Sequence, residues 1–408
     1  MDYPVESEPR QMKLGLEAVV DPTNTAYRGN APIRCPPGAI CSSPGQQVSI
    51  GNGSEPSQDE TNSRASTFPL RVTEYPEFRY MGSKQKLLPW IHEVLRTIDF
   101  QTAADPFVGS GCVSYLMKSM GKQVKASDFL NFPAVIAEAT VANQRYRLDH
   151  SVIERLLTPV LGGPDFITST FTGVFYNIED LRFLDSISAR IDEIQNRYLR
   201  AMALAALIRS CLKKQPRGVF TVSGNLAHYD DGRRDLRLSI RDHFLEQTKI
   251  FNELVFYNGQ RNVARQLDVF DLHPQGIDLV YLDPPYVPRS DDNCYIKRYH
   301  FLEGLSCYWR GLRIMKDTKV RKIEKKNTPF GYRKTALNAF DRLFRLFQGS
   351  IIVLSYSSNG YPDLPELEAL MRRYKRDIVI HRKPHRYHFG THSSVERAAV
   401  QEYLIVGR

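Results

Sequence analysis

The residues most suggestive of chemistry in this 408-residue sequence are Asp283-Pro284-Pro285-Tyr286. They follow an apolar stretch, residues 277–282, that we expect to be a buried strand, and open α/β sheets bind ligands beyond such strand ends. Proline has a fixed φ and no N–H, so the carbonyls of this segment remain available as acceptors. Asp283 and the Pro284 carbonyl suit the two protons of an exocyclic amine, and the Tyr286 ring suits the face of a planar base. Holding both protons would leave the nitrogen lone pair free to attack; the alternative is a rigid turn that only ends a strand.

A glycine loop, Asp105-Pro-Phe107-Val-Gly109-Ser-Gly111, is a second candidate ligand site. Its glycines allow the backbone to approach a ligand at the start of a predicted helix. The spacing matches neither the GxGxxG of dinucleotide folds nor a phosphate loop, so it favours a zwitterionic amino-acid ligand over a pyrophosphate.

Two further acids end predicted strands. Asp128 follows the strand predicted at 123–127 and is placed to accept hydrogen bonds from ribose hydroxyls, as acids at this position do in dinucleotide folds. Asp268 follows the strand predicted at 262–267 and is a candidate partner for an adenine amine.

The segment Tyr80-Met-Gly-Ser-Lys84 places an aromatic ring and a lysine on a glycine turn before a helix. Lys84 is a candidate to hold a ligand carboxylate. The alternative is a solvated lysine at a helix start, since lysines are mostly exposed.

The elements that must position these residues follow one another along the chain as a strand, a glycine loop, a helix and a second strand that ends in an acidic residue. This succession is typical of the start of a doubly wound α/β sheet. We expect residues 1–70, rich in Pro, Gly, Ser, Asn and Gln, to be a disordered arm or a segment that orders on a partner. Residues 71–144 would form the first part of the α/β domain and 261–408 the second, ending in a hairpin of 377–381 with 402–406. Between them, the helical periodicity of 145–260 predicts an inserted helical region.

These motifs, in this order, resemble the Dam-like class of adenine-specific DNA methyltransferases over residues 78–408. The segment Tyr299-His-Phe-Leu-Glu-Gly304 further resembles a stretch of the type II restriction-modification members. The resemblance implies an S-adenosylmethionine-dependent, Rossmann-like α/β fold with a helical target-recognition insertion. It also implies methyl transfer to adenine N6 in double-stranded DNA, and often a cognate restriction endonuclease as partner.

Roles carry over position by position. The resemblance assigns Asp283, Pro284 and Tyr286 to the target base. It assigns S-adenosylmethionine contacts to Tyr80, Lys84, Asp105, Phe107, Gly109, Gly111, Asp128 and Asp268. Dam itself has tryptophan where this chain has Tyr80, so the aromatic character is kept, whereas the long amino-terminal arm departs from the family pattern.

Basic residues cluster within 209–241 and 316–326, and a net charge of +10 favours a polyanionic partner. A charge run is usually a solvated face, but beside a base-modifying site we interpret these clusters as phosphate contacts, with Arg217, Arg233, Arg234 and Lys322 as DNA-binding candidates. Four histidines at 381–392 look like a metal site, but Pro384 breaks any helix that would align them, and no metal is expected.

Composition sets the remaining limits. No signal peptide or bilayer-spanning stretch is apparent, and six cysteines are too few for a disulfide scaffold, so we expect a cytoplasmic protein without a membrane partner. The nearest rival function is methylation of cytosine N4, which uses the same amine chemistry. Methylation of RNA or of a protein amide, and a non-catalytic DNA-binding relative, are further alternatives.

Overall fold

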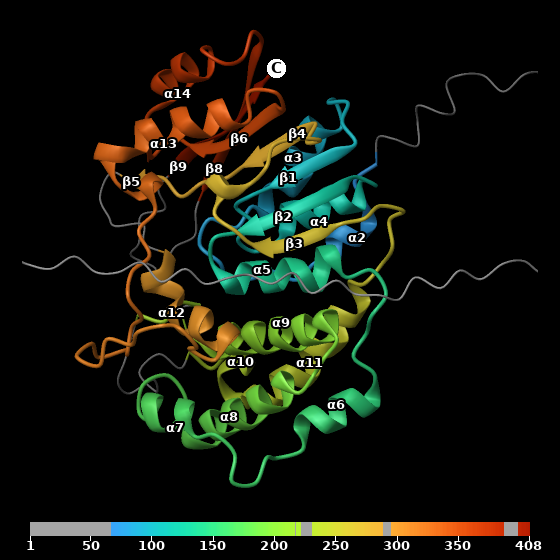
Figure 1. Cartoon of the computed structure of the whole chain (residues 1–408), viewed down its shortest axis with the longest axis vertical. Helices are drawn as coiled ribbons and strands as arrows, with labels where there is room; N and C mark the ends of the chain where they lie inside the picture. Colours follow the sequence, from blue (N-terminus) through green and yellow to red (C-terminus); the bar gives the residue numbers. More distant parts are fainter. Residues whose placement is uncertain (1–66, 217, 222–230, 289–294, 387–398) are drawn as a thin grey trace, which may run out of the picture. The chain divides into compact units, whose positions relative to one another are not determined.

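The computed structural model describes residues 67–408, apart from 217, 222–230, 289–294 and 387–398. The expected amino-terminal arm, residues 1–70, lies almost entirely outside the described residues. The described chain forms an α/β fold built on a seven-stranded sheet, so the predicted fold class is confirmed (Figure 1).

The sheet has the strand order β3-β2-β1-β4-β6-β9-β8. Five strands, β1, β2, β3, β4 and β6, are mutually parallel, and β9 runs antiparallel to both of its neighbours. Their bounds are β1 Thr102–Asp105, β2 Gln123–Asp128, β3 Val263–Gln266, β4 Leu279–Leu282, β6 Ile351–Ser357, β8 Ile378–Arg386 and β9 Ala399–Gly407. The chain order reverses direction between β1 and β4, which is the switch point where doubly wound sheets bind ligands.

Helices cover both faces of the sheet because its strands are apolar on both sides. On one face, Ala103, Leu279 and Tyr281 belong to a core shared with α3 (Leu88–Leu95), α4 (Cys112–Ser119) and α5 (Asn131–Ala137). On the other face, Val280 and Leu282 pack in a core with α13 (Arg333–Leu346) and α14 (Leu364–Met371). The alternation of neighbouring strand residues between the two cores follows from the period of two in a strand.

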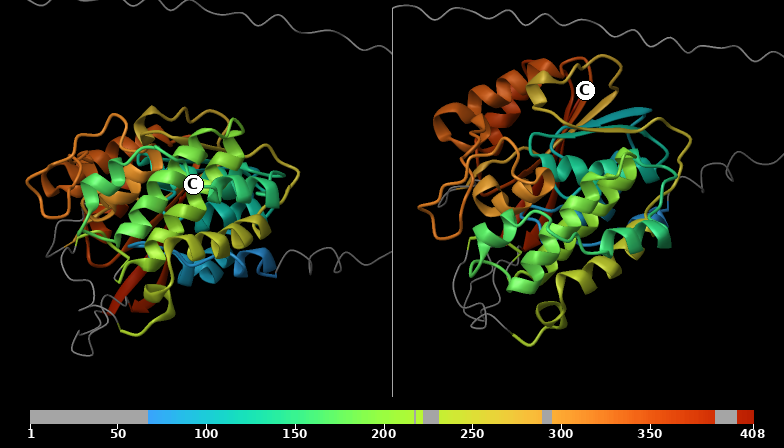
Figure 2. Two further views of the ribbon diagram at one scale, coloured as in Figure 1. Left: turned by 90° about the horizontal axis from the view of Figure 1, so that it is seen from below. Right: turned by 60° about the horizontal axis from the view of Figure 1, so that its bottom comes forward.

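A helical region separates β2 from β3 in the chain. Beyond α5 and the π-helix η2 (Glu138–Ala142), it comprises α6 His150–Leu157, α7 Phe166–Phe171, α8 Ile178–Asp192, α9 Arg197–Lys214, α10 Arg234–Arg237 and α11 Ile240–Glu253. Figures 1 and 2 show these green and yellow helices gathered on the α5 side of the sheet.

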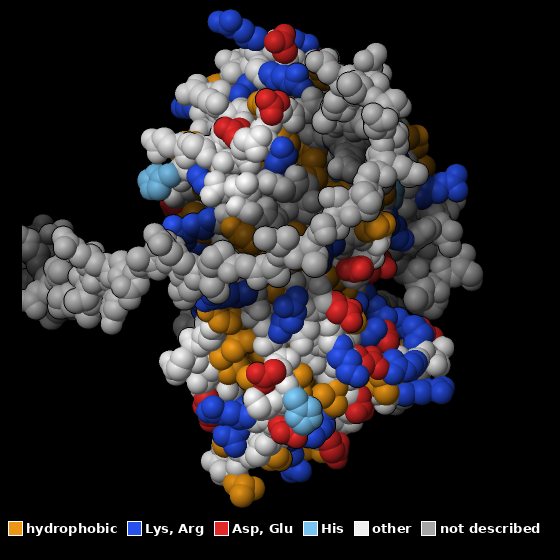
Figure 3. All heavy atoms as spheres, turned by 90° about the vertical axis from the view of Figure 1, so that its right-hand side faces the viewer, with side chains coloured by type: hydrophobic (Ala, Val, Ile, Leu, Met, Phe, Trp, Pro, Cys, Tyr) orange, Lys and Arg blue, Asp and Glu red, His pale blue; other side chains and the backbone are white. Residues whose placement is uncertain are grey.

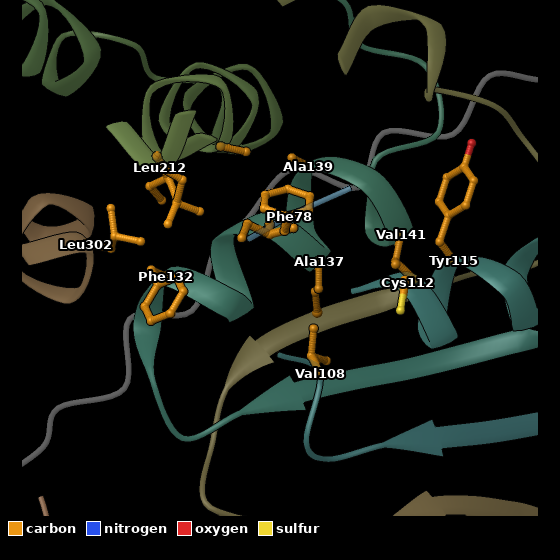
Figure 4. Packing of buried hydrophobic residues seen from close by; sticks show 14 of the residues in the cluster. Phe78, Val108, Cys112, Tyr115, Phe132, Ala137, Ala139, Val141, Leu212 and Leu302 are labelled. Atoms are coloured by element: carbon orange, nitrogen blue, oxygen red, sulfur yellow. The ribbon is translucent and has the colours of Figure 1, made fainter. Parts of the chain in front are cut away.

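The helical region and the sheet share one hydrophobic core. Figure 4 shows Leu212 of α9 and Leu302 of α12 (Tyr295–Cys307) pointing toward Phe132 of α5, with Val108 of the glycine loop nearby. All of these side chains are buried in the same cluster. Continuous packing of this kind couples the helical region to the loop at the end of β1, because closely packed interiors transmit displacement.

Short elements complete the described chain. They are α2 Leu70–Thr73, the 3₁₀ turns η1 Gln85–Leu87, η4 Val269–Asp271 and η5 Pro329–Gly331, and a two-stranded sheet of β5 (Val287–Pro288) with β7 (Gly360–Tyr361). The expected terminal hairpin is present as β8 paired with β9, and it is longer than the sequence indicated.

Candidate active site

A cavity lies at the carboxyl ends of the central strands. Asp105 ends β1, Asp128 ends β2, and Asp283 directly follows β4. Because β1 lies between β2 and β4, these three acids from separate parts of the chain meet at one edge of the sheet. The sequence-predicted residues that line the cavity are Tyr80, Lys84, Asp105, Phe107, Gly109, Asp128, Asp268 and Asp283.

The glycine loop is held against the neighbouring strand. Gly109 has a φ of +52°, and its N–H donates to Oδ2 of Asp128 at 3.0 Å. A Cβ at this position would lie 2.9 Å from the Tyr80 ring. Glycine is therefore required both by the backbone conformation and by the ring of Tyr80 packed against the loop.

Asp105 and Asp128 are buried acids whose hydrogen bonds come from the protein itself. Asp105 accepts from the Ser114 hydroxyl at 2.6 Å, and Asp128 also accepts from the Leu130 N–H at 2.9 Å. Burial raises the pKa of each carboxyl to about 7, although these hydrogen bonds oppose the shift. A cationic ligand would favour the ionised forms of both acids.

Lys84 and Asp283 form a buried ion pair. The Lys84 Nζ donates to both carboxylate oxygens of Asp283, at 2.7 and 2.8 Å, and to the Gly82 carbonyl at 3.1 Å. The Lys84 side chain is 5% exposed. Burial raises the pKa of Asp283, and the Lys84 charge opposes that rise. The sequence prediction placed Lys84 only at a ligand carboxylate, so its pairing with Asp283 is a new feature.

Aromatic side chains enclose the other end of the cavity. Phe270 stacks on Phe330 with ring centroids 5.8 Å apart, and Phe107 meets Phe330 edge-on at 5.5 Å. Phe270, Phe330, Tyr295 and Lys326 line the cavity but were missed by the sequence reasoning. Phe270 follows Asp268 by two residues, which was a usable signal. Lys326 and Phe330 lie more than 40 residues beyond Asp283 and carry no local signal.

A column of tyrosines forms a further wall. The Tyr80 ring stacks on Tyr299 at 5.0 Å and on Tyr295 at 5.6 Å. The Tyr299 hydroxyl accepts from the Met81 N–H at 2.7 Å, which fixes the Tyr80–Lys84 turn against α12.

Three predicted site residues do not line the cavity. Gly111 has a φ of +81° and begins α4, where a Cβ would lie 2.6 Å from the Tyr75 hydroxyl, so its role in the structure is to shape the loop. Pro284 is buried. Tyr286 is partly buried against Tyr356, with ring centroids 5.2 Å apart, and pairing of β5 with β7 fixes the chain directly after it.

The predicted DNA-binding cations lie away from the cavity lining. Arg233 donates to Asp231 at 2.7 Å and to the Pro216 carbonyl, and Arg234 pairs with Glu246. Lys322 is half-buried beside the His300 side chain, whose pKa it helps to lower. Arg217 lies outside the described residues. Intramolecular partners therefore account for much of the positive charge in the first basic cluster.

The cavity suits a nucleoside that carries an amino-acid group. It offers carboxylates at three strand ends, a close-approaching glycine loop, a lysine, and an aromatic enclosure formed by Phe107, Phe270 and Phe330. The phosphate-binding glycine patterns of nucleotide folds are missing from the loop. The strand order and this set of groups are consistent with the α/β fold of methyltransferases.

Comparison with known proteins gives the family. Residues 80–328 match the D12 class of N6 adenine-specific DNA methyltransferases. The type II methyltransferase M2.HphI of Haemophilus parahaemolyticus is 31% identical over 77% of this chain and 92% of its own length. The modification methylase LlaI of Lactococcus lactis subsp. lactis and the type II methyltransferase M.FokI of Planomicrobium okeanokoites are each 24% identical over 80% of this chain. The chain spans only 54% and 52% of those two relatives.

The chain therefore belongs to the D12 class, and it is an enzyme that methylates adenine N6 in DNA. The cytosine, RNA, protein-amide and non-catalytic alternatives give way to this assignment. Among the residues described, no helix has the length and apolar content to cross a membrane, and no group of His, Cys, Asp and Glu is arranged to bind a metal ion. His388 and His392 lie outside the described residues.

Proposed function

We propose that this enzyme methylates adenine within one specific sequence of double-stranded DNA, as the modification enzyme of a restriction-modification system. The names of its relatives support the proposal, since M2.HphI and M.FokI are type II methyltransferases. A cognate restriction endonuclease is then its functional partner, and the cytoplasm, where its DNA substrate lies, is its place of action.

The observation that carries the assignment of the site is the position of Asp283. Its carboxylate lies in the same cavity as Asp105, Asp128 and the glycine loop, so the group proposed for the target amine faces the groups proposed for the cofactor. S-adenosylmethionine, when bound, supplies an electrophilic methyl group on its sulfonium. The residues proposed to hold it are Tyr80, Lys84, Asp105, Phe107, Gly109, Asp128 and Asp268, joined by Phe270 and Phe330. Gly111 is proposed to act indirectly, by shaping the loop that carries Gly109.

Each end of that ligand has a proposed partner. Asp105 and Lys84 carry the charges opposite to those of its ammonium and carboxylate, and Asp128 is proposed to accept from the ribose hydroxyls. Asp268 is exposed, and one of its oxygens already accepts from the Phe270 N–H at 3.0 Å, which orients the carboxylate beside the aromatic enclosure. There it is proposed to accept from the adenine amine.

The target amine is proposed to donate one proton to the Asp283 carboxylate and the other to the Pro284 carbonyl. These hydrogen bonds would localise the lone pair on N6 for direct attack on the methyl carbon, without a covalent intermediate on the protein. The carbon–sulfur bond would break as the carbon–nitrogen bond forms, the sulfur would keep the electron pair as a neutral thioether, and N6 would release one proton, for which Asp283 is the proposed acceptor. The base must leave the helical stack for this, since enzymes that act on bases extrude them from the duplex. Tyr286 is proposed to stack on the extruded ring, and α6–α11 are proposed as the target-recognition region.

Mapping of modified bases tests this proposal. DNA from cells that express the wild-type protein should contain N6-methyladenine at one recurring sequence when read by long-read sequencing. Asp283→Ala should abolish the signal, whereas Asp317→Ala, which removes an exposed acid outside the cavity lining, should retain it. Methylated adenines without a recurring sequence would contradict the specificity, and methylation by Asp283→Ala would contradict the catalytic assignment.

A further inference from the structure

A second hollow follows the outer strand β3, away from the active site. It is lined by four arginines and two tyrosines: Arg145, Arg197, Arg261, Arg265, Tyr146 and Tyr198. β3 is the outermost strand on its side of the sheet, and Arg261 precedes it, at its amino end. Asp283 lies at the carboxyl end of β4, three strands away, so the two sites open at different parts of the sheet.

The charge of this hollow has one sign. None of the described residues that line it is acidic. Arg197 pairs with Glu138 at its margin, whereas Arg261 and Arg265 make no ion pair with any residue that the structure describes. Figure 3 views the molecule from the side on which β3 begins, where basic and acidic side chains are otherwise intermixed over the surface. The hollow therefore differs from the surface around it.

Stacking holds part of this positive charge in place. The Tyr146 and Tyr198 rings stack with centroids 5.5 Å apart and 16° between their planes. The Arg145 guanidinium lies 4.7 Å from the Tyr146 ring centroid, and the Arg197 guanidinium lies 5.2 Å from that of Tyr198. Such cation–π contacts restrain arginines, so less side-chain entropy is lost when an anion binds.

We propose that this hollow binds the phosphodiester backbone of a DNA segment other than the one whose adenine occupies the active site. Planar guanidinium groups match phosphate oxygens in geometry and charge, and DNA is the polyanion that the enzyme meets in its reaction. A second contact of this kind holds the enzyme on long DNA between methylation events, because backbone contacts are independent of sequence. The inference rests on DNA as substrate and is independent of the roles proposed for Asp283 and Tyr286.

The test compares two variants that lose the same charge. Arg145→Ala/Arg261→Ala/Arg265→Ala removes three exposed arginines of the hollow and leaves the Arg197–Glu138 pair intact. The control, Arg96→Ala/Arg372→Ala/Arg376→Ala, removes three exposed arginines that lie outside both the hollow and α6–α11. Affinity for a long duplex without a target sequence is measured at several salt concentrations, alongside methylation of a short duplex that only spans the target. Far-UV circular dichroism of each variant checks its folding.

On long DNA, the plot of log affinity against log salt should lose about 0.9 of its slope for each phosphate contact removed, or up to about 3 for the hollow variant. The control should keep the wild-type slope, and both variants should methylate the short duplex at the wild-type rate. Equal slopes for the hollow variant and the control would overturn the proposal and leave the hollow to another anionic partner, such as an acidic protein surface. Loss of short-duplex methylation in the hollow variant alone would also overturn it, by placing these arginines on the path of the target segment.

Discussion

Replacing Lys84 by methionine should change the pH dependence of methylation, because Lys84 is paired with the acid proposed to hold the target amine. Its Nζ lies 2.7 and 2.8 Å from the two oxygens of Asp283, and the lysine is almost fully buried. Methionine keeps most of the side-chain volume and removes the charge. Asp283 would then be buried without its cation, and the pKa of its carboxyl would rise above its already raised value.

The size of the effect follows from the cost of leaving a buried hydrogen-bonded group without its partner, about 1–3 kcal/mol. One pH unit corresponds to about 1.4 kcal/mol, so the acid limb of the rate profile should move up by about one to two pH units. The protonated carboxyl cannot accept an N–H at the same oxygen. The variant should therefore lose rate on the acid side of the profile, by about 10- to 100-fold at pH values below the pKa of Asp283 in both proteins, and approach the wild-type rate at higher pH.

Single-turnover transfer of a labelled methyl group to a duplex, measured between pH 6 and 9.5 at saturating cofactor, gives the profile. Lys86→Met is the matched control, since Lys86 is exposed on the next turn of the same segment. Titration calorimetry with S-adenosylhomocysteine measures cofactor affinity separately. An unshifted profile with only weakened cofactor affinity would refute the coupling, and would mean that Lys84 serves the cofactor alone.

Four further outcomes are expected. Asp128→Ala should weaken S-adenosylhomocysteine binding by about 1–3 kcal/mol in calorimetry. Binding of S-adenosylmethionine to the wild-type protein should release protons near pH 7, because a cationic ligand favours the ionised forms of Asp105 and Asp128. Binding heats that do not depend on the ionisation enthalpy of the buffer would contradict this proton release. Tyr286→Ala should suppress the fluorescence rise of 2-aminopurine at the target position far more than it lowers duplex affinity, since base–aromatic stacking contributes about 1–3 kcal/mol. Tyr286→Phe keeps the ring and should keep most of the fluorescence rise. A full fluorescence rise with Tyr286→Ala would exclude Tyr286 as the stacking partner. Burial lowers the pKa of Lys118 to about 7, so between about pH 7 and 10 the unfolded state binds more protons than the folded state. The free energy of unfolding should therefore rise with pH in this range, by up to about 1.4 kcal/mol per pH unit. Denaturant titrations of Lys118→Met should show a smaller rise with pH, and an equal rise in both proteins would contradict the burial of an uncharged amine.

Much of the site could be predicted because it is built from strand ends. Asp105, Asp128 and Asp283 each stand at or directly after the end of a strand, and parallel strands bring their carboxyl ends to one edge whatever the length of chain between them. The meeting of the three acids at one edge could therefore be anticipated from a doubly wound sheet, whereas the order of its strands was not predicted. Bounds of the parallel strands differ from the predictions by one or two residues, as at β4, where pairing with β1 begins at Leu279 and not at Ile277. The hairpin strands β8 and β9 extend up to five residues beyond the predicted bounds.

What could not be predicted are contacts between distant segments that have no local pattern. Lys84 and Asp283 are 199 positions apart, and nothing near Lys84 in the sequence specifies its partner. Phe330 reaches the cavity from η5, which follows the second basic cluster, and its sequence neighbourhood carried no signal for a cavity residue. Arg233 and Arg234 were singled out for their charge, but side-chain pairing with Asp231 and Glu246 depends on the fold of the helical region.

The charges around the cavity explain why one lysine can have two partners. Four acids, Asp105, Asp128, Asp268 and Asp283, line the cavity, against two lysines, Lys84 and Lys326. Lys326 also lies 3.5 Å from the buried Glu303, so its charge is already engaged. A ligand that brings a sulfonium and an ammonium adds positive charge where it is most lacking, and its single carboxylate can share Lys84 with Asp283. Because the same added charge would favour the ionised form of Asp283, we expect cofactor binding to prepare this acid for the target amine before the base arrives.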